Sequence, residues 1–307
     1  MGSMSEAEGT SPVGTVLVAG GGILGSQIAF QTAFHGFRVT LYDIDDAAIA
    51  RARQSCAGLK QAYATDMGAD DAAIEATLGR IAFTDALGDA ARDAHLVIEA
   101  IPESIDIKKA FYNQLAALAP ANTIFASNSS TFVPSQLAEF TGRAERYLHL
   151  HFSNRIWKHN TAEIMGSPAT SPDVFDTVTV FARRIGMVPL PLHREHPGYI
   201  GNALLVPLLT AALDLVAHGV ADVQSIDRNW MINRETPLGP FAMLDNIGMR
   251  TAQQIAQNQH KNEPSARTAT VLDYIDGMIA SGKLGAAAGE GFYRYPDPAY
   301  ARPDFLC

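Results

Sequence analysis

The sequence of 307 residues predicts an α/β domain built on a doubly wound sheet, followed by an all-α domain. Two observations carry this prediction. Short β-type runs alternate with helical patterns up to about residue 192, an order typical of a parallel sheet with helices on both faces. After the segment HREHPG at 193–198, strand patterns disappear and helical patterns continue. We therefore expect a disordered tail or tag at 1–12, an α/β domain at 13–196 and a helical domain at 197–307.

Composition narrows the class of protein. Hydrophobic residues make up 47% of the chain and charged residues 18%, which is ordinary for a soluble enzyme. A net charge of −9 without a basic stripe argues against a nucleic-acid partner. The most apolar helical pattern, near 204–213, is too short to span a bilayer, so no membrane partner is expected. Cys56 and Cys307 are too far apart to indicate a disulfide framework or a metal site, which fits a reducing cytoplasm.

The first strand–helix junction carries a glycine pattern. TVLVAG at 15–20 predicts a buried strand, and a helical pattern begins after GGILG. Gly20, Gly22 and Gly25 stand at the spacing Gly-x-Gly-x-x-Gly. The first glycine permits a tight turn, the second lets backbone approach a pyrophosphate, and the third lets the helix pack on the strand. The junction therefore predicts a Rossmann-type dinucleotide site at a helix N-terminus.

The second strand, FRVTLYD, ends in Asp43, where a carboxylate can accept a hydrogen bond from a ribose 2′-hydroxyl. No arginine follows to bind a 2′-phosphate, so the sequence predicts NAD rather than NADP. Alternatively Asp43 caps the next helix, expected over about 45–63, although Asp45 and Asp46 could do so instead. Cations on that helix form a solvated face or contact phosphates of a nucleotide-bearing substrate: Arg51, Arg53 and Lys60.

The remaining patterns complete both domains. HLVIEAIPE at 95–103 and TIFAS predict buried strands, and YLHLHF, TAEIMG and MVPLPL predict three more. In the second domain, YIGNALLVPLLTAALDLVAHG predicts a long apolar helix interrupted at Pro207. Such a helix is more often buried in a bundle core or a subunit interface than used as a ligand site.

Four chemistry-bearing side chains stand beside predicted strand ends: Ser130, His151, Asn154 and Glu163. A histidine with an acidic partner at a strand end can move a proton on a hydroxyl or carbonyl group. A single histidine is more often a core residue satisfied by a backbone carbonyl. The nucleotide pattern upstream favours the catalytic interpretation here.

The chain resembles the short-chain L-3-hydroxyacyl-CoA dehydrogenases from about residue 14 to 295. Its markers, in the order of that family, are GGGILG, LYDID, VIEAIPE with IKKAF, ASNSS, HFSN, AEIMG, HPGYIGNALLVP, PLGPFAMLD and GKLGAAAGEGFYRY. The resemblance implies reversible, NAD-dependent oxidation of a short-chain (S)-3-hydroxyacyl-CoA to the 3-oxoacyl-CoA. It places this oxidoreductase in fatty acid metabolism and implies a homodimer formed by the C-terminal helices.

The resemblance also assigns residues. It implies that His151 is the general base, that Glu163 pairs with it, and that Ser130 and Asn154 complete the catalytic set. Substrate would contact Ser130, Asn154, Asn202 and, by a looser match to CoA-binding lysines, Lys60. The implied cofactor contacts are Gly20, Gly22, Ile23, Leu24, Gly25, Asp43, Glu103, Lys108 and Asn128.

The loop after Asn154 departs from the family, which usually reads HFFNP followed by another proline. Arg155, Trp157, Lys158 and His159 stand where small or apolar residues are expected. We expect at least one of them to border the acyl pocket, with Trp157 favouring short or polar acyl groups. Alternatively, the cations point outward and Trp157 packs against the C-terminal domain. The departures also leave open a free 3-hydroxy acid substrate, of sugar-acid or carnitine type. A non-catalytic NAD-binding structural protein is a further alternative, against which the four retained active-site residue types argue.

Overall fold

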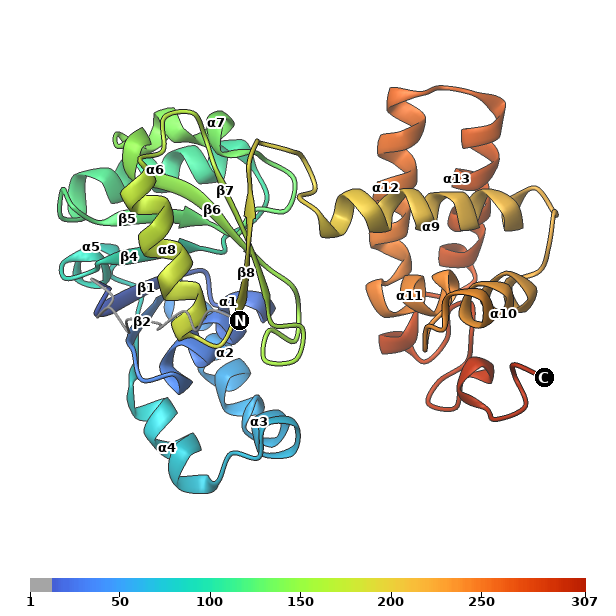
Figure 1. The fold of residues 1–307 in the computed structure, drawn as a ribbon, viewed down its shortest axis with the longest axis horizontal. Helices are drawn as coiled ribbons and strands as arrows, with labels where there is room; N and C mark the ends of the chain where they lie inside the picture. The colour runs from blue at the N-terminus through green and yellow to red at the C-terminus, as the bar shows by residue number, and fades with distance from the viewer. Residues whose placement is uncertain (1–12) are drawn as a thin grey trace, which may run out of the picture. The chain divides into compact units, whose positions relative to one another are not determined.

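The computed structural model describes residues 13–307, and the expected tail at 1–12 lies outside them. The chain forms two compact units (Figure 1). The first ends at Tyr199 and the second begins at Ile200, a few residues beyond the boundary expected between 196 and 197.

The first unit is built on one eight-stranded sheet of order β3-β2-β1-β4-β5-β6-β7-β8. Strands β1 to β6 are parallel, and their order reverses direction between β1 and β4, which confirms the doubly wound class. The strands are β1 Thr15–Ala19, β2 Arg38–Tyr42, β3 Ile81–Thr84, β4 Leu96–Glu99, β5 Ile124–Ser127, β6 Tyr147–Phe152, β7 Thr161–Gly166 and β8 Val188–Leu192.

Strand β7 runs antiparallel to β6, which the strand–helix alternation did not predict. The loop 153–160 between these strands contains no helix, and a connection so short cannot make the crossover that a parallel pair requires. The antiparallel ladder places His151 directly opposite Glu163.

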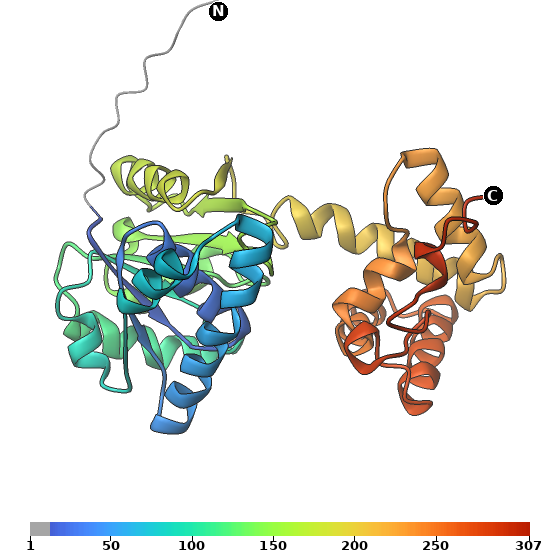
Figure 2. The ribbon, with the colours of Figure 1, turned by 90° about the horizontal axis from the view of Figure 1, so that it is seen from below.

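Helices cover both faces of the sheet (Figures 1 and 2). Val16 and Val18 of β1 pack in the layer that contains α1 and α8, whereas Leu17 and Ala19 pack in the layer that contains α5 and α6. This alternation follows from the two-residue period of a strand. The helices are α1 Ile23–Phe34, α2 Asp46–Gly58, α3 Lys60–Met67, α4 Asp71–Gly79, α5 Leu87–Ala91, α6 Ile105–Leu118, α7 Pro134–Leu137 and α8 Pro172–Arg184.

The single helix expected over about 45–63 is wrong, because α2 ends at Gly58 and α3 begins at Lys60. The backbone N–H of Leu59 donates to the carbonyl of Cys56, three residues back, so the α-helical hydrogen-bond ladder is interrupted there. Glycine at the end of α2 favours this break because of its low helix propensity.

The second unit is all-α, as expected, and has its own hydrophobic core. Asp245 is buried within it and accepts hydrogen bonds from the backbone N–H groups of Phe292 and Tyr293, which ties the C-terminal segment to α11. Within residues 13–307, no helix is both long and apolar enough to cross a membrane. The helices are α9 Gly201–Ala217, which contains Pro207, α10 Val223–Arg234, α11 Pro240–Ile247, α12 Met249–Asn262 and α13 Ala266–Ala280.

Candidate active site

The glycine turn after β1 has the close approaches that its spacing predicts. Gly20 has a φ of 101°, a conformation that favours glycine. A Cβ on Gly25 would lie 1.9 Å from the carbonyl oxygen of Gly20, so helix α1 can approach the turn only with glycine there. The space around Gly22 is different, because a Cβ there would meet no protein atom within 4 Å. Its open side is therefore available to a ligand.

A cavity of about 290 Å³ lies at this turn. Its lining joins the start of α1 to the ends of β4 and β5, the edge of the sheet where parallel strands present their carboxyl ends. Most of the expected cofactor residues therefore share one hollow. The lining residues are Gly22, Ile23, Leu24, Gly25, Glu99, Ala100, Ile101, Glu103, Lys108, Asn128, Ser129 and Ser130.

Asp43 is bound to the glycine turn itself. Its carboxylate accepts hydrogen bonds from the backbone N–H groups of Gly21 and Ile44, each at 2.8 Å. Helix α2 is capped instead by Asp45, whose carboxylate accepts from the N–H of Ala48 at 2.7 Å. The alternative role of Asp43 as a helix cap is therefore wrong, and its ribose contact stays a prediction.

The imidazole of His151 is held at both nitrogens. Nδ1 lies 2.8 Å from Oε2 of Glu163, and Nε2 lies 3.0 Å from Oγ of Ser130. His151 and Glu163 are each only 7% exposed. With Nδ1–H donating to the carboxylate, the lone pair of Nε2 faces Ser130 and can take a proton. These side-chain partners exclude the alternative of a core histidine satisfied by a backbone carbonyl.

Glu103 organises the loop that carries Ser130. Its Oε1 accepts hydrogen bonds from Oγ of Ser129, from the N–H groups of Ser130 and Thr131, and from Oγ1 of Thr131. Lys108 adds an ion pair at 3.2 Å. Burial alone would raise the pKa of Glu103, but these hydrogen bonds and the charge of Lys108 outweigh it and lower the pKa to about 2.

Lys108 also forms a buried ion pair that sequence reasoning missed. Its Nζ lies 2.6 Å from Oε1 of Glu99, and both side chains are fully buried. Glu99 further accepts hydrogen bonds from the hydroxyl groups of Tyr112 and Ser127. A buried ion pair is tolerated when its remaining hydrogen-bonding positions are filled in this way. The adjacent carboxyl ends of β4 and β5 bring Glu99 and Ser127 together.

Asn128 holds the end of strand β6. Its Oδ1 accepts a hydrogen bond of 2.8 Å from the backbone N–H of Phe152, the residue after His151. Asn154 lies two residues further on and is exposed, and no side-chain hydrogen bond is recorded for it among the described residues. The structure thus brings Asn128 to the site, while the catalytic role of Asn154 stays a prediction.

The loop between β6 and β7 is anchored to α3. Trp157 is 9% exposed, packs beside Tyr63 at a centroid distance of 5.3 Å, and donates its indole N–H to Asp66 at 2.9 Å. Arg155 and Lys158 reach the same carboxylate at 3.6 and 3.7 Å. These contacts give no support to Trp157 as the wall of an acyl pocket. Its packing partner belongs to the first unit, not to the C-terminal domain as the alternative supposed.

Two further site residues were missed, His149 and Tyr199. The ring of Tyr199 stacks on that of His151, with centroids 4.3 Å apart and an interplanar angle of 10°. The run YLHLHF did contain a signal for His149. It stands two residues before His151, and residues i and i+2 of a strand lie on the same face. Tyr199 offered no signal beyond its place at the expected domain boundary.

Two predicted substrate contacts lie apart from this cluster in the sequence. Lys60 is the first residue of α3, and Asn202 lies in the first turn of α9 in the second unit. Their roles in binding substrate stay predictions.

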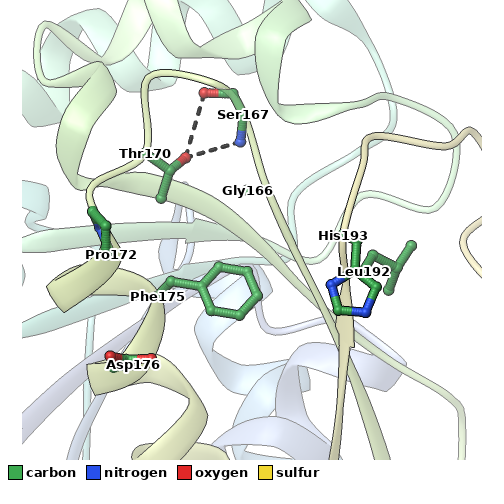
Figure 3. A pocket seen from close by; sticks show the side chains of 8 residues that line it. All are labelled: Gly166, Ser167, Thr170, Pro172, Phe175, Asp176, Leu192 and His193. Carbon is green, nitrogen blue, oxygen red and sulfur yellow. Dashed lines mark hydrogen bonds between the residues drawn. The ribbon is translucent and has the colours of Figure 1, made fainter.

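A second hollow, of about 280 Å³, lies where β7 and β8 end (Figure 3). Gly166 is paired with Leu148 near the start of β6, so this hollow is at the opposite edge of the sheet from the glycine turn. Ser167 and Thr170 hydrogen-bond each other there, and His193 and Asp176 are exposed. The charged side chains that line this hollow are therefore exposed, whereas the first cavity is lined by the buried Glu99 and Lys108.

Known proteins match both units. Residues 15–195 match the family model described as 3-hydroxyacyl-CoA dehydrogenase, NAD binding domain, and residues 198–295 match the corresponding C-terminal domain. Human mitochondrial hydroxyacyl-coenzyme A dehydrogenase is 31% identical over 285 residues, which cover 91% of this chain and 90% of that protein. A probable 3-hydroxybutyryl-CoA dehydrogenase of Deinococcus radiodurans is 33% identical, with coverages of 91% and 99%.

Among solved structures, a diketoreductase described by its action on dicarbonyl compounds is 48% identical to this chain. The two folds superpose with a TM-score of 0.88 over 93% of this chain and 100% of the diketoreductase. The match therefore includes both units.

Proposed function

The chain belongs to the 3-hydroxyacyl-CoA dehydrogenase family, and from this premise we propose that it oxidises short-chain (S)-3-hydroxyacyl-CoA to 3-oxoacyl-CoA reversibly, with NAD as cofactor. The observation that carries the proposal is the imidazole of His151, held between Ser130 and Glu163 close to the cavity at the glycine turn. This arrangement supplies a base beside a nucleotide site, as hydride transfer from an alcohol requires.

The residues of the cavity fit NAD. The open side of Gly22 and the first turn of α1 suit a pyrophosphate, and Asp43 at the end of β2 suits a ribose hydroxyl. The chemistry that NAD supplies when bound is acceptance of a hydride at its nicotinamide ring. We propose the following cofactor contacts: Gly20, Gly22, Ile23, Leu24, Gly25, Asp43, Glu103, Lys108 and Asn128.

The proton leaves the substrate separately from the hydride. Nε2 of His151 takes the proton of the 3-hydroxyl group as the C3–O bond becomes a carbonyl, and Glu163 stabilises the imidazolium that forms. Ser130 donates a hydrogen bond to the reacting oxygen. In the reverse direction His151 returns the proton to the ketone oxygen. Asn154, Asn202 and Lys60 complete the proposed substrate contacts.

A second candidate keeps this chemistry but uses a free dicarbonyl compound in place of a thioester. The diketoreductase, at 48% identity, supports it. So does the departure of the β6–β7 loop from the family pattern, with Arg155 and Lys158 held by Asp66 where small or apolar residues are usual.

A matched set of substrates separates these candidates. Purified chain is assayed with NADH or NADPH against acetoacetyl-CoA, free acetoacetate and 2,4-pentanedione. We expect the highest kcat/KM with acetoacetyl-CoA and NADH. A higher value with 2,4-pentanedione would favour the dicarbonyl candidate. Turnover with none of the three would contradict both and favour a non-catalytic NAD-binding protein.

We also propose a homodimer formed by the helices of the second unit. Large apolar side chains on this unit are exposed in the single chain, among them Leu204 at 72%, Val220 at 67% and Ile232 at 50%. These side chains would be covered if the helices of two copies packed together, and contiguous apolar surface often marks a subunit interface. Light scattering should give twice the chain mass, and Leu204→Glu should shift the protein toward monomer. A monomeric wild type would contradict the proposal.

A reducing compartment such as the cytoplasm is proposed for the chain, because Cys56 and Cys307 are both free thiols. The human relative is named mitochondrial. Fractionation of source cells followed by immunoblotting should find the chain with cytoplasmic markers, and recovery with another compartment would contradict this.

A further inference from the structure

Tyr199 occupies an unusual position at the end of the first unit. Its side chain is only 2% exposed, and its φ of 55° lies in the left-handed region, which is rare for a bulky residue. A backbone conformation of this kind persists when surrounding contacts fix it, and such residues cluster at functional sites. Its side chain contacts both His151 and the loop that carries Ser130.

The ring of Tyr199 covers one face of the catalytic imidazole. The two rings are nearly parallel, 10° apart in orientation, with centroids at 4.3 Å. His151 is also bonded at its two nitrogens, which lie in the plane of its ring. The two hydrogen bonds alone leave the ring plane freer to tilt. Stacking on Tyr199 restrains that tilt.

The hydroxyl group of Tyr199 belongs to a hydrogen-bond chain with one consistent direction. It donates to the carbonyl oxygen of Ser129 at 2.6 Å. Its single proton is then used, so it accepts from Nδ1–H of His149 at 2.8 Å. Nε2 of His149 is left as an acceptor for the hydroxyl group of Tyr147 at 3.0 Å. Each hydrogen bond in this series therefore has one defined donor and one defined acceptor.

His149 is suited to remain in this tautomer. It is fully buried, and burial, reinforced by the charge of Lys108, lowers the pKa of its imidazole to about 3. The ring is therefore neutral at neutral pH, so one of its nitrogens donates while the other accepts. His149 is therefore not placed to act as a second base. Its acceptor nitrogen faces the hydroxyl group of Tyr147 rather than the cavity.

This hydrogen-bond chain ends at the peptide group that joins Ser129 to Ser130. The carbonyl of Ser129 accepts from Tyr199, and the N–H of Ser130, in the same peptide group, donates to Oε1 of Glu103 at 3.1 Å. This peptide is thus held from both sides. The hydroxyl group of Ser130 then meets Nε2 of His151 at 3.0 Å. Tyr199 therefore contacts the imidazole directly and holds its partner serine through one peptide group.

We propose that Tyr199 is a positioning residue for proton transfer, whose ring fixes the plane of His151 and whose hydroxyl group fixes Ser130. His149 holds Tyr199 in this position. The inference rests on the proposed function, in which His151 moves the proton.

Tyr199→Phe tests the hydroxyl group while keeping the ring. We expect kcat for acetoacetyl-CoA reduction to fall roughly 10-fold, because a small displacement of a catalytic group is costly. The KM for NADH should stay within about twofold. The matched control is Tyr63→Phe, which also removes a fully buried hydroxyl group of the first unit, bonded there to Gln31. That variant should lose stability, measured as Tm, but keep its kcat.

A double-mutant cycle distinguishes positioning from a general loss of stability. If Tyr199 acts through Ser130, Tyr199→Phe should have little effect on kcat in a Ser130→Ala background. Equal losses in both backgrounds would overturn the inference, as would a Tyr199→Phe enzyme with kcat within twofold of wild type. In either case an inactive His151→Ala variant would leave the proposed function standing. An active His151→Ala variant would contradict the proposed function itself.

Substitutions of His149 give a second test if Tyr199→Phe does not fold. Asn supplies an N–H group near the position of Nδ1, whereas Leu of similar size does not. We expect His149→Asn to retain several-fold more kcat than His149→Leu, with the KM for NADH unchanged in both. Equal kcat values for the two single variants would overturn the inference.

Discussion

Replacement of Glu163 by Gln provides the sharpest test of the charge beside His151, the proposed base. The substitution keeps the size of the side chain and leaves an oxygen that can still accept from Nδ1–H of His151. It removes only the negative charge. Because the two side chains are about nine-tenths buried and 2.8 Å apart, water screens their interaction weakly.

The magnitude follows from Coulomb's law. Two unit charges with centres about 4 Å apart attract by about 4 kcal/mol at an effective dielectric constant of about 20. About half of the positive charge on His151 is developed in a transition state midway through proton transfer, so about 2 kcal/mol of stabilisation is lost. This corresponds to a decrease of roughly 30-fold in kcat.

The assay is the initial rate of NADH consumption with saturating acetoacetyl-CoA, together with a fluorescence titration of NADH. We expect the lower kcat with an unchanged Kd for NADH, since Glu163 does not line the cavity at the glycine turn. Glu139→Gln, at an exposed carboxylate of the same unit, is the matched control and should behave as wild type. A kcat for Glu163→Gln within about threefold of wild type would refute the role of this charge.

Four further predictions follow from the same geometry. His151→Ala should lower kcat by roughly 10²–10⁴ without changing the Kd for NADH, because only proton transfer is lost. Asp43→Ala should bring the kcat/KM values for NADH and NADPH closer together, mainly by weakening the binding of NADH. Equal kcat/KM values for the two cofactors in the wild type would contradict the role of Asp43. Trp157→Val should lower Tm but leave the dependence of kcat/KM on acyl chain length unchanged, because the indole packs in the core; a longer preferred chain would show that it lines the pocket. The lowered pKa of Glu103, about 2 against an ordinary 4.5, stabilises the fold above pH 4.5, and this contribution is lost as pH falls toward 2. Urea unfolding should therefore depend less on pH across that interval in Glu103→Gln, and an identical dependence would contradict the assignment.

The parts of the site that sequence predicted are those set by local geometry. The glycine turn follows from three residues within one strand–helix junction, and the approach of Gly25 to Gly20 bears out the reason for its spacing. His151 and Glu163 stand in consecutive strand patterns, so their pairing required only that the strands be neighbours. The helix break at Leu59 was missed because one glycine in a helical pattern is usually tolerated.

The contacts that sequence did not predict join segments far apart in the chain. Trp157 meets Asp66 across 91 positions, and Tyr199 reaches Ser129 across 70. Hydrophobic pattern and spacing describe a single element and its neighbours, so they carry no signal for such pairs. A tryptophan in a loop and a tyrosine at a domain boundary are each compatible with many environments until the fold is known.

The backbone of the β6–β7 loop gives the departure from the family a physical meaning. Arg155 has a φ of 60°, whereas proline is confined to a φ near −65°. A chain with proline at this position must therefore follow a different path after Asn154. Here the loop is held instead by the N–H of Arg155, which donates to Gln27 at 2.7 Å, and by the contacts at Asp66. The acid–base pair of β6 and β7 is thus combined with a differently shaped loop at its border. That combination fits an enzyme that retains the chemistry of the family while the substrate it accepts can differ.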